Sequence, residues 1–234
     1  MAQKKLGVLG GMGPMATVDF LRKLTDLTPS ADDQGHVPLI VHTYPQAPDR
    51  TRALTDGGPT PLPYLIEGAR SIEQAGACAL VIPCNTAHAW YGAVQAAVSI
   101  PIIHIADAAL AQIKVCSDQP RIGLLSTPGT IKSGVYTQHR SDIHWVVPPE
   151  DLLNRSVLPA IRSVKANDIP TAVEQLALAE DWIKAQQVET VILGCTELPL
   201  IADQLTTLSV YVDATQALAK QALAWWLQAT HVDV

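Results

Sequence analysis

The feature that most constrains the fold of this chain is an internal repeat of two short segments. The segment GVLGGMGP, which begins at Gly7, is echoed by GLLSTPGT, which begins at Gly123. The segment VIPCNT around Cys84 is echoed by ILGCTE around Cys195. For either echo alone, chance similarity among buried strands is an equally good explanation. Two echoes in the same order, about half the chain apart, favour a duplicated unit with the two cysteines at equivalent positions.

The rest of the chain alternates between strand-like and helix-like segments. Short apolar runs rich in β-branched residues are typical of strands buried on both faces of a parallel sheet; they cover 6–9, 37–43, 79–82, 102–104, 122–125, 143–147, 190–193 and 210–212. Segments of helical period lie between them, at 62–75, 169–187 and 214–227. The pattern predicts an α/β fold of two pseudo-symmetric α/β domains with mainly parallel central sheets. We expect domains at 1–105 plus 212–234 and at 106–211.

Composition excludes several classes of protein. The net charge of −6 gives no electrostatic footprint for nucleic acid or an anionic membrane. The first residues, MAQKKLGVLGG, do not resemble a secretory signal, and no apolar run reaches the roughly 18 residues of a membrane helix. The four cysteines are widely spaced, without a C-x-x-C metal pair, and are predicted to be reduced thiols. We therefore expect a cytoplasmic globular protein.

Cys84 and Cys195 are the strongest candidates for catalysis. Ligands of open α/β sheets bind beyond the carboxyl ends of the strands, so two such halves would present one thiol from each side of a cleft. A helix start after each cysteine would lower the pKa of its thiol. One thiolate and one thiol on opposite faces of a carbon can invert that carbon by proton transfer. Cys78 and Cys116, by contrast, are expected to be inert buried residues.

Several motifs resemble those of the aspartate/glutamate racemase family. They are GGMGP at 10–14, PQAPDRT at 45–51, PCNTAH at 83–88, LSTPGT at 125–130 and GCTELPL at 194–200. The resemblance implies two pseudo-symmetric α/β domains, an amino-acid substrate in the cleft between them, no pyridoxal phosphate or other cofactor, and no metal. It also implies a homodimer.

Two positions point to one branch of this family. Glutamate racemases carry histidine two residues after the second cysteine, whereas this chain has Glu197. Together with Arg50 in its Pro-Asp-Arg setting, this favours aspartate racemases and predicts interconversion of L- and D-aspartate. Tyr44 departs from the family pattern and would reshape the pocket wall. A broad-specificity, glutamate-type or hydantoin-type racemase therefore remains an alternative.

Further residues complete the expected site. The resemblance implies that Arg50 and Lys165 bind the side-chain carboxylate from the two halves, although such residues are usually a solvated arginine and a charge at a helix end. The α-carboxylate and the charge that develops during proton removal would be met by polar groups near helix starts: Asn85, Thr86, Thr127, Thr130 and Thr196. An ordinary helix cap is the structural alternative for each threonine.

Three residues within the motifs have open roles. Met12 is expected to supply a backbone amide to the site or to pack within its loop. Glu197 is expected to influence the protonation of Cys195. His88 lies one helical turn after Cys84, where it would either tune the thiol or pack as an ordinary histidine.

Two rival functions belong to other classes. The segment GMGPMA at 11–16 fits the G-x-G-x-x-A fingerprint of dehydrogenases. Pro14 removes a backbone amide from that loop, however, and the strand at 37–43 ends without the acid that would bind a ribose. A non-catalytic two-domain binder of a dicarboxylic amino acid would explain Arg50 and Lys165 but not the paired cysteines.

Overall fold

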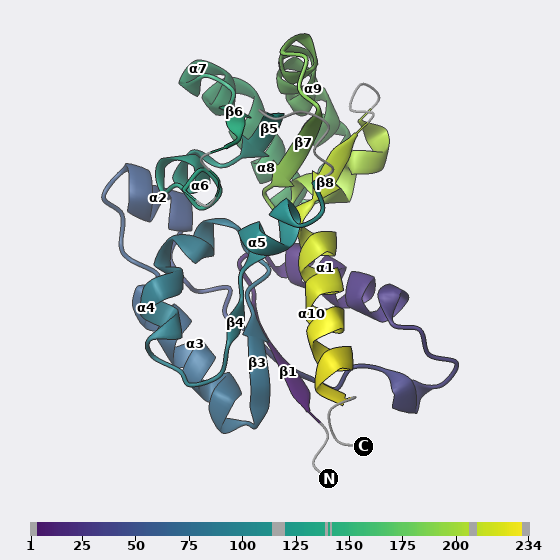
Figure 1. Ribbon diagram of the computed structural model, residues 1–234. Helices are drawn as coiled ribbons and strands as arrows, with labels where there is room; N and C mark the ends of the chain where they lie inside the picture. The colour runs from purple at the N-terminus through teal and green to yellow at the C-terminus, as the bar shows by residue number, and fades with distance from the viewer. Residues whose placement is uncertain (1–3, 114–119, 139, 141, 206–209, 231–234) are drawn as a thin grey trace.

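Figure 1 presents the computed structural model of the chain, which describes residues 4–113, 120–138, 140, 142–205 and 210–230. Strands and helices alternate along it as the sequence predicts. The first half contains β1 (Lys5–Gly10), α1 (Pro14–Leu27), η1 (Asp33–Gly35), β2 (Leu39–Thr43), α2 (Arg50–Thr55), α3 (Leu62–Gln74), β3 (Ala77–Val81), η2 (Thr86–Trp90), α4 (Tyr91–Gln95), β4 (Ile102–Ile103) and α5 (Ile105–Leu110). The second half contains β5 (Arg121–Ser126), α6 (Pro128–Lys132), β6 (His144–Val146), α7 (Glu150–Leu152), the π-helical turn η3 (Leu153–Val157), α8 (Leu158–Lys165), α9 (Ile169–Ala185), β7 (Thr190–Gly194), η4 (Leu198–Gln204), β8 (Tyr211–Asp213) and α10 (Ala214–Thr230).

The strands form two parallel sheets with the same topology. The first has the order β2-β1-β3-β4 and the second the order β6-β5-β7-β8. The repeated segments thus occupy equivalent strands, since β1 matches β5 and β3 matches β7. The predicted fold class is confirmed. One detail is wrong: β2 is an edge strand and is only partly buried, with Val41 42% exposed.

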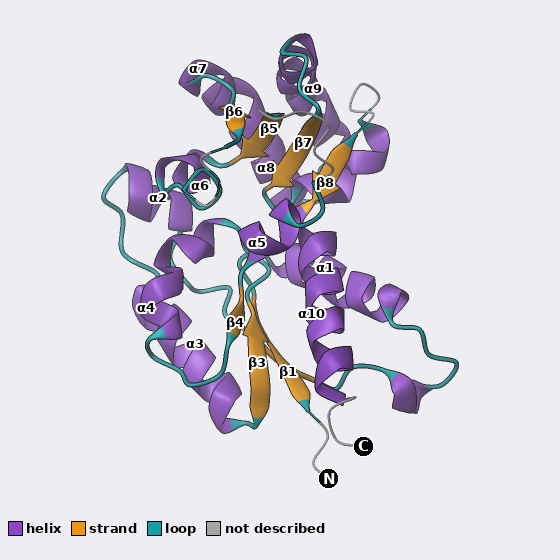
Figure 2. Ribbon diagram, in the orientation of Figure 1, coloured by secondary structure: helices purple, strands orange, loops and turns teal. Residues whose placement is uncertain are grey.

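The two sheets point their carboxyl ends toward the middle of the molecule (Figure 2). One core cluster draws side chains from both halves, among them Phe20, Ile122 and Leu218. Burial of these side chains removes apolar surface from water and stabilises the contact between the halves. Helix α10 follows the second sheet but packs against α1 and α5 of the first half (Figure 1). The division into domains at 1–105 plus 212–234 and at 106–211 stays a prediction.

A buried ion cluster also joins the halves. The Lys23 Nζ of α1 lies 2.5 Å from carboxylate oxygens of both Asp19 and Asp213. The other oxygen of Asp213 accepts the backbone N–H groups of Thr215 and Gln216 at the start of α10. A buried charge is tolerated when it is paired and hydrogen-bonded, as here. The cluster fixes the start of α10 against α1 and so fixes the second sheet relative to the first half.

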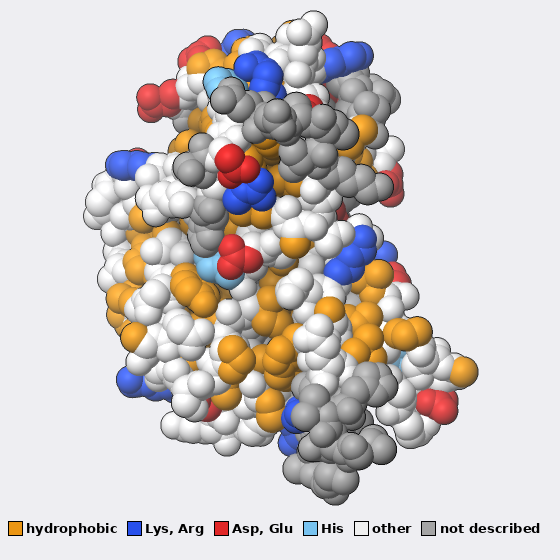
Figure 3. Space-filling model, viewed as in Figure 1, with side chains coloured by type: hydrophobic (Ala, Val, Ile, Leu, Met, Phe, Trp, Pro, Cys, Tyr) orange, Lys and Arg blue, Asp and Glu red, His pale blue; other side chains and the backbone are white. Residues whose placement is uncertain are grey.

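The surface offers no strong charge bias on the face in view. Figure 3 shows lysine and arginine side chains dispersed among acidic ones. Within the described residues, no helix combines the length and the apolar character that crossing a membrane requires.

The turn after β1 brings the amino-terminal loop to the centre of the molecule. Gly11 has φ +88, and a Cβ there would lie 2.4 Å from the backbone nitrogen of Tyr44. Only glycine combines this left-handed conformation with such close backbone packing. Its N–H donates to the Thr17 hydroxyl at 2.9 Å, which ties the loop to α1. The loop is therefore held close to the end of β2 and directs Met12 and Gly13 toward the second half.

Candidate active site

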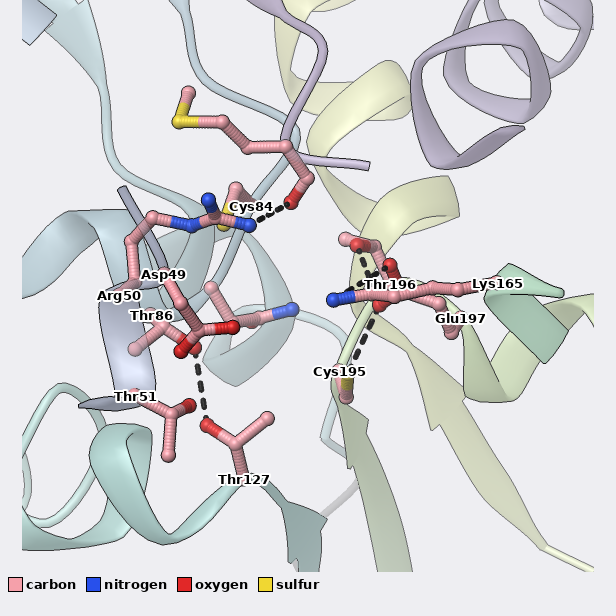
Figure 4. Close-up of a pocket in the computed structure, with 12 residues that line it drawn as sticks. Asp49, Arg50, Thr51, Cys84, Thr86, Thr127, Lys165, Cys195, Thr196 and Glu197 are labelled. Atoms are coloured by element: carbon pink, nitrogen blue, oxygen red, sulfur yellow. Dashed lines mark hydrogen bonds and ion pairs between the residues drawn. The ribbon is translucent and has the colours of Figure 1, made fainter. Parts of the chain in front are cut away.

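A cavity lies between the carboxyl ends of the two sheets. Its lining comes from loops of both halves (Figure 4): Met12, Asp49, Arg50, Thr51, Cys84, Asn85, Thr86, Thr127, Lys165, Cys195, Thr196 and Glu197. It is narrow, with a volume of about 20 Å³. All of the predicted site residues except Thr130 line it. Their placement in one cavity is observed, while their individual roles stay predictions.

Cys84 enters the cavity from the loop after β3 and is only 5% exposed. The short 3₁₀ helix η2 begins two residues later, at Thr86, so the predicted helix start is present but is not α-helical. His88 accepts the Ile105 N–H on its Nε2, at 3.2 Å, and its Nδ1 lies 2.9 Å from the carbonyl oxygen of Cys84. Because Nε2 is an acceptor, Nδ1 carries the proton and donates to that carbonyl. His88 thus holds the backbone of Cys84 and does not contact its thiol through these bonds.

Cys195 follows β7 on the other side of the cavity and is also 5% exposed. Its Sγ donates to Oε2 of Glu197 at 3.0 Å, and the Thr196 hydroxyl donates to the same oxygen at 3.4 Å. Burial and the adjacent Glu197 carboxylate raise the pKa of the Cys195 thiol well above its ordinary value. The expected lowering of the thiol pKa is therefore wrong for Cys195, whose following 3₁₀ helix starts only at Leu198.

Glu197 connects Cys195 to Lys165. The Lys165 Nζ, at the end of α8, lies 3.7 Å from Glu197 Oε1, which has no hydrogen-bond partner among the described residues. Burial opposes the charge on Lys165, but the neighbouring Glu197 and Cys195 outweigh it and raise the pKa of the ammonium group. A Cβ on Gly13 would lie 3.1 Å from the same Oε1. The amino-terminal loop therefore packs against the Lys165–Glu197 pair. A dinucleotide bound at the GMGPMA segment of this loop would need open space at that position.

Arg50 begins α2 and faces Lys165 from the first half (Figure 4). Its terminal nitrogens donate to the backbone carbonyls of Met12, Ala47 and Pro48 at 3.1–3.2 Å. Its Nε is buried and has no hydrogen-bond partner among the described residues. Backbone carbonyls satisfy donors but do not neutralise the guanidinium charge. Among the described residues, no carboxylate forms an ion pair with Arg50. Its positive charge near the cavity therefore stays without a paired negative charge.

Three hydroxyls join the loops of the two halves beside Cys84. Thr86, from the first half, lies 3.0 Å from the Thr127 hydroxyl and 2.9 Å from that of Thr130. Thr127 also accepts the Thr130 N–H at 3.1 Å and so caps α6, as the structural alternative predicts. Thr130 completes the triangle but does not line the cavity. The Thr130 hydroxyl is turned toward the other two threonines, and its contact with the substrate stays a prediction.

Other expectations are corrected by the structure. Tyr44 does not line the cavity: its hydroxyl bonds Glu67 at 3.2 Å and its ring stacks on His42. Cys78 is exposed, not buried. Cys116 lies outside the described residues.

Within the part of the chain described, no three histidine, cysteine, aspartate or glutamate side chains are grouped in a way that would hold a metal ion.

Two residues of the lining were not predicted, Asp49 and Thr51. Both flank Arg50 in the loop PQAPDRT, and their position beside a predicted ligand was the available signal. Asp49 accepts the Arg52 N–H at 2.8 Å and thereby caps α2. The cap fixes the first turn of α2 and so the direction of Arg50.

Replacing Glu197 with glutamine is expected to let Cys195 ionise at lower pH. The change removes the negative charge that opposes the Cys195 thiolate and that accepts its proton, so the pKa of the thiol falls. The measurement is the pH dependence of alkylation by iodoacetamide, followed by mass spectrometry of the peptide that contains Cys195. Cys84 in the same sample is the internal control. A midpoint for Cys195 that stays in place or rises would contradict the assignment of Glu197.

Comparisons with known proteins give the same fold and identify one family. The family described as Asp/Glu/hydantoin racemase matches residues 9–222. The structure of an aspartate racemase from Picrophilus torridus superimposes with a TM-score of 0.83 at 30% identity, covering 95% of this chain and 94% of that one. A broad-specificity amino-acid racemase of Bacillus subtilis is 25% identical over 228 residues, covering 95% of this chain and 98% of that one. A glutamate racemase of Limosilactobacillus fermentum is 30% identical over 219 residues, covering 88% and 73% respectively.

Proposed function

The chain belongs to the Asp/Glu/hydantoin racemase family, and from this we propose that it interconverts L- and D-aspartate by proton transfer between Cys84 and Cys195. One observation carries the proposal: two buried thiols reach a single cavity from opposite halves of the molecule. Inverting a carbon needs a base on one face and an acid on the other. The duplicated fold supplies one thiol for each face.

The surroundings of the two thiols suggest how the proton moves. In one direction Cys84, as thiolate, removes the α-proton, and the electron pair of the C–H bond moves into the α-carboxylate. Cys195, held as a thiol by Glu197, then donates its proton to the other face of the carbon. Cys84 ends as the thiol and Cys195 as the thiolate, and the reverse reaction exchanges the roles. Donors near Cys84, including Asn85 and Thr86, would stabilise the charge on the carboxylate.

Aspartate is proposed as substrate because two cations face the cavity. Arg50 and Lys165 come from opposite halves, and the charge of Arg50 opposes that of Lys165. A carboxylate between them would relieve this repulsion and accept hydrogen bonds from both. The cavity has room for about one water molecule, so side chains at its rim must move when an amino acid enters. Lys165, whose side chain is 40% exposed, is placed to do so.

Broad specificity is the second candidate. The Bacillus subtilis relative with that activity matches nearly the whole of this chain. Glu197 also neutralises part of the Lys165 charge, which would weaken the preference for an acidic side chain. A glutamate-type or hydantoin-type substrate would use the same two thiols.

The assembly and the compartment are also proposals. We propose a homodimer, as the motifs around Cys84 and Cys195 imply by resemblance, and size-exclusion chromatography with light scattering would measure it. Thiol catalysis requires both cysteines in the reduced form, which is the state kept by the reducing environment of the cytoplasm.

The test is proton NMR and polarimetry of L-aspartate in deuterated water with metal-free, cofactor-free enzyme. We expect the optical rotation to decay to zero while deuterium replaces the α-proton. Activity on glutamate or larger amino acids, with none on aspartate, would support proton transfer between the two thiols but reject aspartate as the substrate. Absence of exchange with every amino acid tried, together with measurable binding of aspartate, would reject catalysis in favour of a dicarboxylate-binding protein.

A further inference from the structure

The residue after Cys84 carries a donor that none of the described residues accepts from. Asn85 is 2% exposed and lines the cavity, and its Nδ2 is buried without a hydrogen-bond partner among the described residues. A buried amide N–H₂ without a partner is costly, and native proteins keep few of them. Such a group in the cavity beside the Cys84 thiol indicates a donor reserved for a ligand.

The other end of the Asn85 amide is fixed by Tyr136. The Tyr136 hydroxyl, which reaches Asn85 from the segment after α6 in the second half, donates to Asn85 Oδ1 at 2.5 Å. Burial raises the pKa of Tyr136 above its ordinary value, so the hydroxyl keeps its proton and remains a donor. This proton has no other acceptor among the described residues.

The bond determines which way the planar amide is turned. If the amide rotated by half a turn, the Tyr136 proton would face an N–H₂ group and lose its acceptor. The oxygen of Asn85 would then face the cavity, where it would repel a carboxylate. Tyr136 itself is held firmly, since it is 1% exposed, belongs to the central core cluster, and packs its ring 6.2 Å from that of Trp145.

We propose that Tyr136 is a positioning residue of the racemase reaction, which fixes the Asn85 amide so that its N–H₂ group donates to the α-carboxylate of the substrate. This inference rests on the proposed function. As the α-proton leaves, negative charge grows on that carboxylate, and a donor fixed in advance stabilises the charge without reorganising. The second half of the molecule thus orients a donor beside the cysteine of the first half.

The same charge develops whichever enantiomer reacts. Removal of Tyr136 from the network is therefore expected to slow both directions.

The test is a double-mutant cycle of wild type, Tyr136→Phe, Asn85→Ala and the double variant, with kcat and KM measured in both directions. Tyr136→Phe deletes only the hydroxyl and is expected to lower kcat about tenfold or more in each direction. In the Asn85→Ala background the same substitution is expected to change kcat by less than about twofold, because residues that act through one contact are not additive. Additive losses, or an unchanged kcat in Tyr136→Phe, would overturn the inference.

Two further variants separate positioning from stability. Ser156→Ala also removes a buried hydroxyl, which donates to the Gln175 carbonyl away from the cavity, and is expected to lower the melting temperature while leaving kcat unchanged. Asn85→Asp keeps an acceptor for Tyr136 but has no N–H₂ group, so it is expected to lose as much activity as Asn85→Ala. Full activity in Asn85→Asp would overturn the donor role. If the wild type is active and Tyr136→Phe has the same kcat, only this inference is rejected. If the wild type has no racemase activity, the proposed function is rejected as well.

Discussion

Replacing either Cys84 or Cys195 with alanine is expected to lower the racemisation rate by about 10²–10⁴-fold in both directions, the range typical of a lost general acid or base. Each thiol serves as base in one direction and as acid in the other, so neither direction can proceed with one of them missing. Both side chains are small and only 5% exposed, and alanine leaves little empty volume behind. The measurement is polarimetry on each enantiomer, with a circular dichroism spectrum of every variant.

Cys78→Ala is the matched control for this experiment. Cys78 lies on β3, in the same strand-and-loop unit as Cys84, but its side chain is exposed and does not line the cavity. Its replacement is expected to leave the rate unchanged. Substantial racemisation by Cys84→Ala or Cys195→Ala would contradict the two-base assignment, whatever the behaviour of the control.

Replacing Lys165 with methionine is expected to weaken the binding of dicarboxylates by roughly tenfold to a hundredfold, the value of one hydrogen bond to a charged group. Methionine keeps a long apolar side chain but removes the ammonium group that faces Arg50 across the cavity. Inhibition of the racemase by succinate, compared with inhibition by butyrate, measures the contribution of the second carboxylate. The inhibition constant of succinate is expected to rise, while that of butyrate changes little.

Arg52→Met is the control for the removal of a cation. Arg52 lies two residues after Arg50, is exposed, and does not line the cavity. We expect it to bind succinate as the wild type does. The contrary result is that Lys165→Met weakens the binding of succinate and of butyrate by the same factor. Lys165 would then act on the whole site through Glu197 and would not bind the side-chain carboxylate.

The sequence by itself determined the architecture of this protein. Buried strands of a parallel sheet need apolar side chains on both faces, so their positions are visible as short apolar runs, and each predicted strand overlaps one of β1–β8. The repeat paired β1 with β5 and β3 with β7, and the fold gives both sheets one topology. Strand ends in such sheets meet at one edge, which is why residues near Cys84 and Cys195 were expected in one site.

Only the tertiary structure decided how the groups of the site act on each other. The pKa of Cys195 depends on burial and on the distance to the Glu197 carboxylate, and these outweigh the short helix that follows. Tyr44 differs from the family pattern in sequence, yet its side chain points away from the cavity. Tyr136 carries no motif, and its contact with Asn85 joins residues of different halves. Hydrogen bonds and charge interactions depend on separations of a few ångströms, and only the packing of one half against the other sets those separations.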